Sequence, residues 1–317
     1  IKKGLKMTLK WIGVVLGALI AIGLVVNAVF VWITDARLER QLAAIREAGD
    51  PVRLADLARP PIPPEKNAAT YLRRADADLS AIEKEVANRR PGDSMSAEDR
   101  KVVRAALAAY PKVLPLLEQA AACPDYDAEL DYTLPAQEFL AKALDVVQRP
   151  RAAARVLHYQ ATLLVAEGKR DEAVRTALQI FRLASHFDRN PLVVSYLVSI
   201  AVRGQGIRCV EQALQSGPVS KEVREALDAE LAAHERMDRF AWAMKSVRAF
   251  SIESFRHLVP GRDFWLVARG LWNMQESACL EVYPTLIELA GTPHAYRDIE
   301  QSIDSQQSIL ARLLFPA

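Results

Sequence analysis

Residues 11–33 read WIGVVLGALIAIGLVVNAVFVWI and contain no charged side chain. Asn27 is the one polar residue of this stretch besides the glycines. A helix of this length, rising ~1.5 Å per residue, spans a hydrocarbon layer of ~30 Å. Trp11 and Trp32 stand near its two ends, where aromatic side chains favour the membrane interface. The stretch therefore predicts a transmembrane anchor and contact with the lipid bilayer through residues 11–33.

Positive charge is biased toward the N-terminal side of this stretch. Lysines occupy positions 2, 3, 6 and 10, whereas three arginines, mixed with acidic residues, lie within residues 37–46. The bias favours a single-pass cell-membrane protein with its N-terminus in the cytoplasm and the bulk of the chain in the periplasm or outside.

A cleaved signal peptide is the main alternative to an anchor. Val26, Asn27 and Ala28 have the small-residue spacing that a signal peptidase accepts after Ala28. The apolar stretch nevertheless continues to Ile33 and exceeds the ~7–15 residues of a signal-peptide core, which favours the uncleaved anchor. A buried core helix is the third alternative, and it would need a fold that surrounds every face of the helix.

Composition limits the function classes. Beyond residue 10 the chain has 37 Lys and Arg against 39 Asp and Glu, so no basic surface for nucleic acid is expected. Ala and Leu dominate, Gly is scarce, and alternating strand patterns are absent, which predicts an all-α fold. The three cysteines, at positions 123, 209 and 279, have no CxxC spacing and are expected to be small buried thiols, although one disulfide is possible. We expect no cofactor.

The chain divides into three parts: 1–34 (basic tip and anchor), 35–66 (helical stalk and Pro-rich linker) and 67–317 (an all-helical exported domain). In the linker, Pro60–Pro64 is predicted to be extended polyproline II, either a stiff spacer or, through its PxxP spacing, a docking peptide. Further helices are predicted over residues 67–88, 97–110, 114–122, 135–149, 191–216, 220–258, 263–290 and 295–314.

Residues 152–187 form the clearest unit of the exported domain, two apolar-periodic helices around a turn at 167–170 with Asp171 as the expected cap. Gly168 and Ala173 keep the spacing of the turn and close-packing positions of a tetratricopeptide repeat, and Ala161 is small where that repeat needs it. No second copy of this unit follows, so we expect an irregular, tetratricopeptide-like helical hairpin rather than a regular array.

Two patterns invite a metal or catalytic interpretation. Acidic residues alternate over 125–131, but the Gly and Glu that a calcium loop requires are missing, so a solvated acidic loop is expected, with a weak cation site as the alternative. His158 and His186 lie on the two helices of the hairpin and could approach each other, or each be satisfied singly. No GxSxG, GxGxxG, Walker or HExxH pattern occurs, so no catalytic residue and no metal ligand is assigned.

Charged and aromatic residues concentrate in the region 234–272. They are expected either to be core between packed helices or to form a groove or membrane-facing surface, since Trp and Arg suit interfaces. Glu235 or Asp238 with Arg236 or Arg239 would then form a buried ion pair that fixes helix register. The candidate binding residues are His158, His186, Glu235, Arg236, Arg239, Trp242, Trp265 and Trp272.

The run GDPVRLADLARPPIPPEKNAATYLRRA, with Gly49, Pro51, Leu54, Leu57 and the Asn67–Ala69 motif, resembles the start of a group of uncharacterised bacterial membrane-anchored proteins. The segment from Leu134 to Pro191 also resembles that group. The resemblance implies a helical exported domain and carries no activity, so no functional residue transfers. Because the chain begins at Ile1 without Met and ends in an apolar Leu313–Ala317, we expect either end to be a fragment boundary.

The favoured hypothesis is a membrane-tethered scaffold of the bacterial envelope that receives another protein or a peptide. An envelope hydrolase or a lipid- or ligand-binding protein is the alternative, and a pocket with convergent polar side chains would favour it.

Overall fold

The computed structural model describes residues 2–89, 91–92, 95–190, 192–234, 238–257 and 262–290, of which 2–10, 238, 257 and 262–267 are described as backbone only. Within these residues every regular element is helical, in agreement with the all-α prediction. The elements are α1 (Lys2–Glu47), η1 (Leu54–Leu57), η2 (Pro64–Lys66), α2 (Ala68–Glu85), α3 (Ala97–Ala109), α4 (Val113–Ala122), α5 (Ala136–Val146), α6 (Gln148–Ala166), α7 (Arg170–Phe187), α8 (Val193–Gln215), α9 (Lys221–Ala233), α10 (Asp238–His257) and α11 (Arg262–Ala290).

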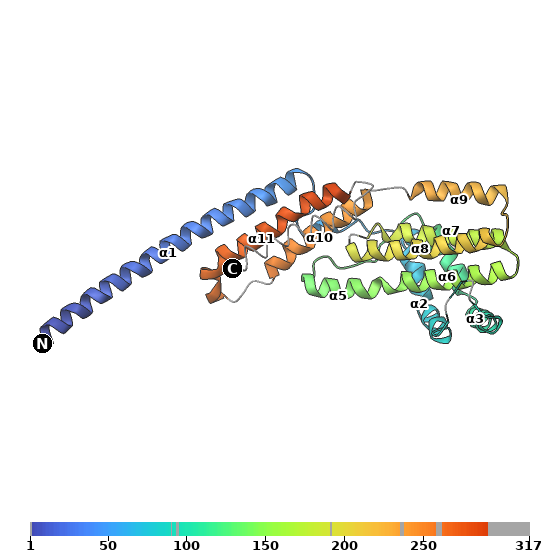
Figure 1. Ribbon diagram of the computed structural model, residues 1–317, viewed down its shortest axis with the longest axis horizontal. Coiled ribbons are helices and arrows are strands. Elements are labelled where there is room, and N and C mark those ends of the chain that lie inside the picture. Colours follow the sequence, from blue (N-terminus) through green and yellow to red (C-terminus); the bar gives the residue numbers. More distant parts are fainter. Residues whose placement is uncertain are drawn as a thin grey trace.

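The apolar stretch and the helix expected after it form one continuous helix, α1, which extends far from the rest of the molecule (Figure 1). Residues 11–26 are exposed along the whole circumference of α1. By length and composition, two described helices could cross a membrane: the segment Trp11–Glu47 and α8. The apolar window of Trp11–Glu47 is entirely unburied, whereas α8 packs on α7 with its Gly206 against the Phe181 ring. The N-terminal segment is thus the one whose apolar surface is left uncovered.

The main hydrophobic core lies among α2, α3, α4, α6, α7, α8 and the start of α9. Its largest fully buried side chains include Tyr159 on α6 and Phe181 and Phe187 on α7. The α6–α7 connection turns through Gly168, whose positive φ of 76° is a conformation that glycine adopts at little cost. Gly206 on α8 lies so close to α7 that a Cβ added to it would stand 3.0 Å from the Phe181 ring.

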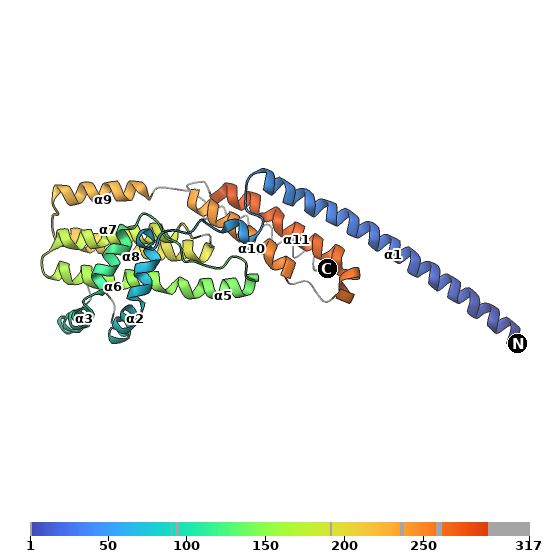
Figure 2. The same cartoon turned by 180° about the vertical axis from the view of Figure 1, so that it is seen from behind.

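Two smaller clusters connect this core to α1. Leu54 and Leu57 of η1, Phe139 of α5 and Ala249 of α10 belong to one cluster. Leu38 and Leu42 of α1, Ile252 of α10, and Leu280 and Tyr283 of α11 belong to the other. Since α10 contributes to both, it joins α1 and α11 to the main helical body, and the molecule is elongated (Figures 1 and 2).

Asp50, just beyond α1, holds this junction electrostatically. Lys245 Nζ and an Arg248 guanidinium nitrogen on α10 lie 2.7 and 2.8 Å from its two carboxylate oxygens. The Arg248 side chain is almost wholly buried, so Asp50 supplies the compensation that a buried guanidinium requires.

Several sequence expectations need correction. The single long helix expected over 220–258 is wrong: α9 ends at Ala233 and α10 begins at Asp238, although 231–240 contains neither Gly nor Pro. Asp171 is not a cap, since Lys169 holds the N-cap position and the Asp171 carboxylate accepts the Ser220 backbone N–H instead. Pro64, expected to be extended, begins the short helix η2. The helix expected over 295–314 lies outside the described residues.

We expect Gly206→Ala to lower the free energy of unfolding by roughly 1–3 kcal/mol, because a packed core resists an added methyl group. Gly204→Ala on the same helix is the matched control. Its Cβ would meet only the Arg208 guanidinium, at 3.7 Å, so the gain in helix propensity should raise stability by ~0.5–1 kcal/mol. Denaturant unfolding of both variants, followed by circular dichroism in one detergent, measures the difference. Equal responses would contradict the close approach of α7 and α8.

Candidate functional site

The two candidate histidines do not meet. His158 on α6 lines a cavity of about 380 Å³ together with Glu83, Arg155 and Arg208. His186 on α7 lies near α4, where its Nε2 donates to the Ala120 carbonyl oxygen at 3.2 Å. The two histidines therefore lie in separate surroundings, and the approach considered from the sequence does not occur.

Both rings are held uncharged by their surroundings. Burial, assisted by Arg208, lowers the pKa of His158 to about 4. Burial, assisted by Arg189, likewise lowers the pKa of His186 to about 4. Both rings are therefore neutral at pH 7, and neither offers a positive charge to an anionic ligand.

Two other candidate residues lie together on the first turns of α10. Arg239 and Trp242 line a cavity of about 400 Å³ with Leu57, Arg59 and Arg189. Trp272 is elsewhere, on α11, where its Nε1 donates to the Phe255 carbonyl oxygen at 3.1 Å. Glu235 and Arg236 lie outside the described residues, and Trp265 is described as backbone only. The ion pair expected between Glu235 or Asp238 and Arg236 therefore also lies outside the described residues.

A second cavity of about 400 Å³ adjoins the first, since both are lined by Arg189 and Arg239. It adds residues from α7, α8 and the end of α9, among them Asp188, Arg203 and His234. We call the two together the arginine cleft; its described lining is Leu57, Arg59, Ser185, Asp188, Arg189, Tyr196, Arg203, Ala233, His234, Arg239 and Trp242. The arginine cleft thus lies where α10 meets the main helical body.

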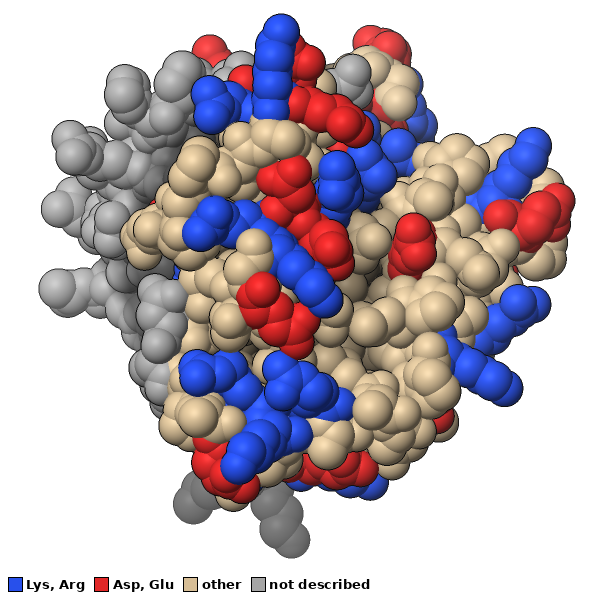
Figure 3. Space-filling view, turned by 90° about the vertical axis from the view of Figure 1, so that its right-hand side faces the viewer, with Lys and Arg blue, Asp and Glu red and all other residues tan. Residues whose placement is uncertain are grey.

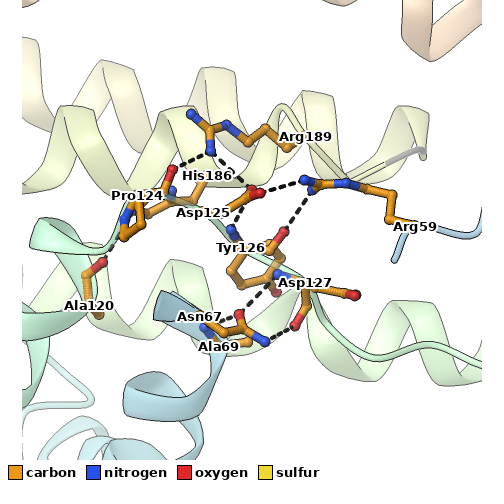
Figure 4. A network of polar contacts seen from close by, with 10 residues as sticks. All are labelled: Arg59, Asn67, Ala69, Ala120, Pro124, Asp125, Tyr126, Asp127, His186 and Arg189. Atoms are coloured by element: carbon orange, nitrogen blue, oxygen red, sulfur yellow. Dashed lines mark hydrogen bonds and ion pairs between the residues drawn. The ribbon is translucent and has the colours of Figure 1, made fainter. Parts of the chain in front are cut away.

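Asp125 positions two of the cleft's arginines (Figure 4). Its carboxylate oxygens lie 2.5 Å from an Arg59 guanidinium nitrogen and 3.0 Å from an Arg189 guanidinium nitrogen. Burial alone would raise the pKa of Asp125, but hydrogen bonds from Arg59, the Tyr126 N–H and Arg189 outweigh it and bring the pKa to about 2. The carboxylate is therefore charged at any physiological pH and shared by two cations.

The loop that carries Asp125 is fixed by one fully buried amide. Asn67, before α2, accepts the Ala69 N–H at 3.0 Å and the Asp127 N–H at 2.9 Å, and it donates to the Asp127 carbonyl oxygen at 2.9 Å. Figure 4 shows these contacts beside those of Asp125. Glu129 of the same loop pairs with Arg73 at 2.7 Å. Two of the alternating acidic residues, Asp125 and Glu129, thus serve three ion pairs, and the described residues contain no cluster suited to a metal ion.

Arg203 is held from the other side of the cleft. It pairs with Asp188, whose side chain is only 4% exposed, and donates to Ser199 Oγ at 3.1 Å. Its Nε donates to Nδ1 of His234 at 3.0 Å. Arg203 is thereby fully engaged and forms a rigid wall of the cleft.

The arrangement of Ser185 and His234 superficially resembles that of a catalytic nucleophile and its general base. Ser185 Oγ lies 3.3 and 3.4 Å from the two ring nitrogens, and Glu230 lies 3.3 Å from His234 Nε2. Because Arg203 donates to Nδ1, the neutral ring carries its proton on Nε2, facing Glu230. No ring nitrogen is left to accept the Ser185 proton, so the geometry does not support nucleophilic catalysis here.

Positive charge remains in excess in the cleft. Four arginines and one aspartate are among its described lining residues. Asp125 and Asp188 balance two of the arginines, and Arg239 makes no ion pair or hydrogen bond with the described part of the chain. The surplus is local, because basic and acidic side chains alternate over the face remote from α1 (Figure 3). Such convergence suits the binding of carboxylates or phosphates.

Sequence reasoning found Arg239 and Trp242 but missed Arg59, Arg189, Arg203 and His234. Arg59 is 180 positions from Arg239 in the chain, and no local spacing brings them together. The acidic alternation at 125–131 was the one available indication, since buried carboxylates require cationic partners.

Comparison of the chain with protein-family models found no match, and neither the curated proteins nor the solved structures compared with it are significantly similar.

The buried histidines predict a specific acid sensitivity. Between about pH 6.5 and pH 4 the unfolded chain binds a proton at His158 and His186, whereas the folded chain does not. The free energy of unfolding should therefore fall as the pH is lowered through this window. In His186→Gln, which keeps a donor for the Ala120 carbonyl, the fall should be shallower when denaturant unfolding is compared at pH 7 and pH 4.5. An unchanged slope in both His186→Gln and His158→Gln would contradict the account.

Proposed function

We propose that this chain is a membrane-anchored protein of the bacterial envelope whose helical domain binds an acidic segment of a partner protein in the arginine cleft. The observation on which the proposal rests is the convergence of Arg59, Arg189, Arg203 and Arg239 on adjoining cavities, where no described residue pairs with Arg239. Trp242 on the same wall adds an apolar contact surface, and Trp and Arg are common among residues that dominate binding energy.

The membrane part of the proposal has the N-terminus in the cytoplasm and the helical domain outside. The exposed apolar surface of α1 and the lysines before it support this topology. A cleaved leader ending at Ala28 is the alternative, and it would remove the exposed residues 11–26 while leaving Phe30 on its contact with α11.

The position of the cleft favours a soluble partner over a lipid headgroup of the same membrane. Between Ile33, the last residue of the apolar stretch, and Glu47, the end of α1, the helix rises ~20 Å. Trp242 lines both the cleft and the cavity beside Gly49 and Asp50, just past the end of α1. With α1 upright, the cleft stands well clear of the bilayer surface.

We further propose that the α6–α7 pair is a tetratricopeptide-like hairpin within this binding domain. The complete burial of Ala161 and Ala173 and the positive φ of Gly168 support it. These are the close-packing and turn positions of that repeat.

The test uses the full chain in lipid nanodiscs, titrated calorimetrically with hexaglutamate and, separately, with inorganic phosphate. We expect hexaglutamate to bind and Arg239→Gln to weaken it roughly tenfold, the scale of one charge-assisted hydrogen bond. Because Arg239 supports no other described contact, its variant should keep the melting temperature of the original chain.

Arg224→Gln is the matched control, since Arg224 is an exposed arginine on α9 and does not line the cleft. Equal losses of hexaglutamate affinity in Arg239→Gln and Arg224→Gln would show that net charge alone causes the effect, and would contradict the proposal. Absence of hexaglutamate binding would also contradict it, and phosphate binding as tight as that of the peptide would replace the partner segment with a small anion.

A further inference from the structure

A groove between α10 and α11 is lined mainly by apolar side chains and has a volume of about 500 Å³. On α11 its lining includes Met274, Ala278, Val282 and Leu286. Because these residues recur every four positions, they lie on one face of the helix. The groove thus follows α11 from Met274 to Leu286, a rise of ~18 Å.

Helix α10 forms the other wall of the groove, through residues that include Met244 and Phe255. The Phe255 and Trp272 rings meet edge to face, with centroids 5.6 Å apart. One turn earlier on α10, Ser251 Oγ lies 2.6 Å from the Tyr283 hydroxyl oxygen. The two helices therefore run antiparallel, with Phe255 at the Trp272 end of the groove and Met244 toward the opposite end.

The Trp272 end of the groove lies level with the end of the apolar stretch of α1. The amide of Asn273 donates to Asp35 at 2.5 Å, two residues after the stretch ends. Further along both helices, Ser277 Oγ donates to Gln41 at 2.7 Å. Helices α1 and α11 therefore run parallel, side by side (Figures 1 and 2). The groove begins at the level where the apolar stretch ends and extends away from it.

Exposed apolar side chains connect this end of the groove to the apolar stretch. Residues 11–26 are exposed on every side of α1. On α11, Leu271 and Met274 are 54% and 42% exposed. Gly270, next to Leu271, faces the Phe30 ring so closely that a Cβ would overlap it. Apolar surface therefore leads from the membrane-spanning stretch to the mouth of the groove.

The groove offers little to a polar ligand. Three charged residues that adjoin lining residues in the sequence are paired on the α1 side: Lys245 and Arg248 with Asp50, and Glu281 with Arg37. Among the described lining residues none is charged, and Gln275 is the only one with an amide side chain. An extended peptide bound here would leave backbone polar groups unpaired, whereas a hydrocarbon chain has no such groups.

The dimensions of the groove fit one acyl chain. The hydrocarbon core of a bilayer is ~30 Å thick, so a chain in one leaflet extends ~15 Å, close to the ~18 Å length of the groove. Its volume lies in the range of ~300–1,000 Å³ that is typical of small-molecule sites.

We propose that the groove between α10 and α11 binds one acyl chain of a phospholipid from the outer leaflet, whose headgroup stays at the membrane surface. The bilayer is the source because the mouth of the groove lies at the end of the apolar stretch. This inference rests on the proposed membrane anchoring of α1. The bound lipid would fasten α10 and α11 to the bilayer beside α1.

The test uses the full chain in nanodiscs that contain phosphatidylcholine with a photoactivatable diazirine at the end of one acyl chain. Irradiation attaches the lipid to the protein groups that the chain end touches, and mass spectrometry of proteolytic peptides locates the adducts. Ala278→Trp should block the groove at its middle, because Ala278 lies between Met274 and Val282 on the lining face. Glu288→Trp is the matched control, since Glu288 is an exposed residue of α11 outside the described lining.

We expect adducts over residues 282–286 severalfold more often than on α9, which is remote from α1 (Figure 1). Residues 282–286 lie ~12–18 Å beyond Met274, where a lipid that stays in the bilayer does not reach. Ala278→Trp should lower these adducts severalfold and leave those within residues 11–26 unchanged, whereas Glu288→Trp should change neither. If circular dichroism shows that a variant does not fold, the adducts of the original chain decide.

Adducts within residues 11–26 but none beyond Ala278 in the original chain would overturn the acyl-chain site and leave the anchor intact. The groove would then belong to a second copy or to another protein segment. Equal losses of the 282–286 adducts in folded Ala278→Trp and Glu288→Trp would also overturn the site. Absence of adducts within residues 11–26 would overturn the anchor and the site together.

Discussion

The packing of α10 between the α1–α11 pair and the helical body is the constraint on which the rest of the structure depends. Its Ala249 belongs to the cluster with η1 and α5, and its Ile252, one turn later, belongs to the cluster with α1 and α11. Asp50 reinforces this junction because it compensates the buried Arg248 and binds Lys245. Helix α10 therefore links α11, and through it α1, to α5, α8 and η1 of the helical body.

The same junction creates the arginine cleft. Arg239 and Trp242 reach the cleft from the beginning of α10, whereas Arg189 and Arg203 reach it from α7–α8. Asp125 and Asp188 hold Arg189 and Arg203 in fixed conformations. Binding an anionic group would therefore cost little further conformational entropy of these side chains. Arg239 has no such partner among the described residues, and in the proposed function its charge is the one that a ligand would meet.

Local sequence patterns were sufficient for most of the secondary structure. The apolar stretch is helical, as predicted, and helices begin after Ser96 and Ser220, where the structure has these serines as the N-caps of α3 and α9. The end of α9 at Ala233 was missed, because residues 231–240 contain no residue that disfavours helix. Helix termination there depends on tertiary contacts, including the capture of His234 by Arg203, which no local pattern encodes.

The site could be predicted only in part, for a related reason. Arg239 and Trp242 were identified by their charged and aromatic neighbourhood within one helix. The residues that face them, Arg59, Arg189 and Arg203, come from distant segments, and only folding of the loop around Asn67 and Asp125 reveals two of them as partners. The sequence suggested a pair of His158 and His186 because both lie on one hairpin, but they lie in different parts of it.

The central claim is that α1 is mounted rigidly on the helical body through α10 and α11. Pulsed electron paramagnetic resonance between nitroxides at Ala36→Cys on α1 and Leu214→Cys on α8 tests it directly, in nanodiscs and in a Cys279→Ser background, since the other two native cysteines are buried. The account predicts a single narrow distance distribution, since both positions are exposed and belong to one packed assembly. A broad or two-peaked distribution would show that the body moves freely on its membrane helix and would contradict the account.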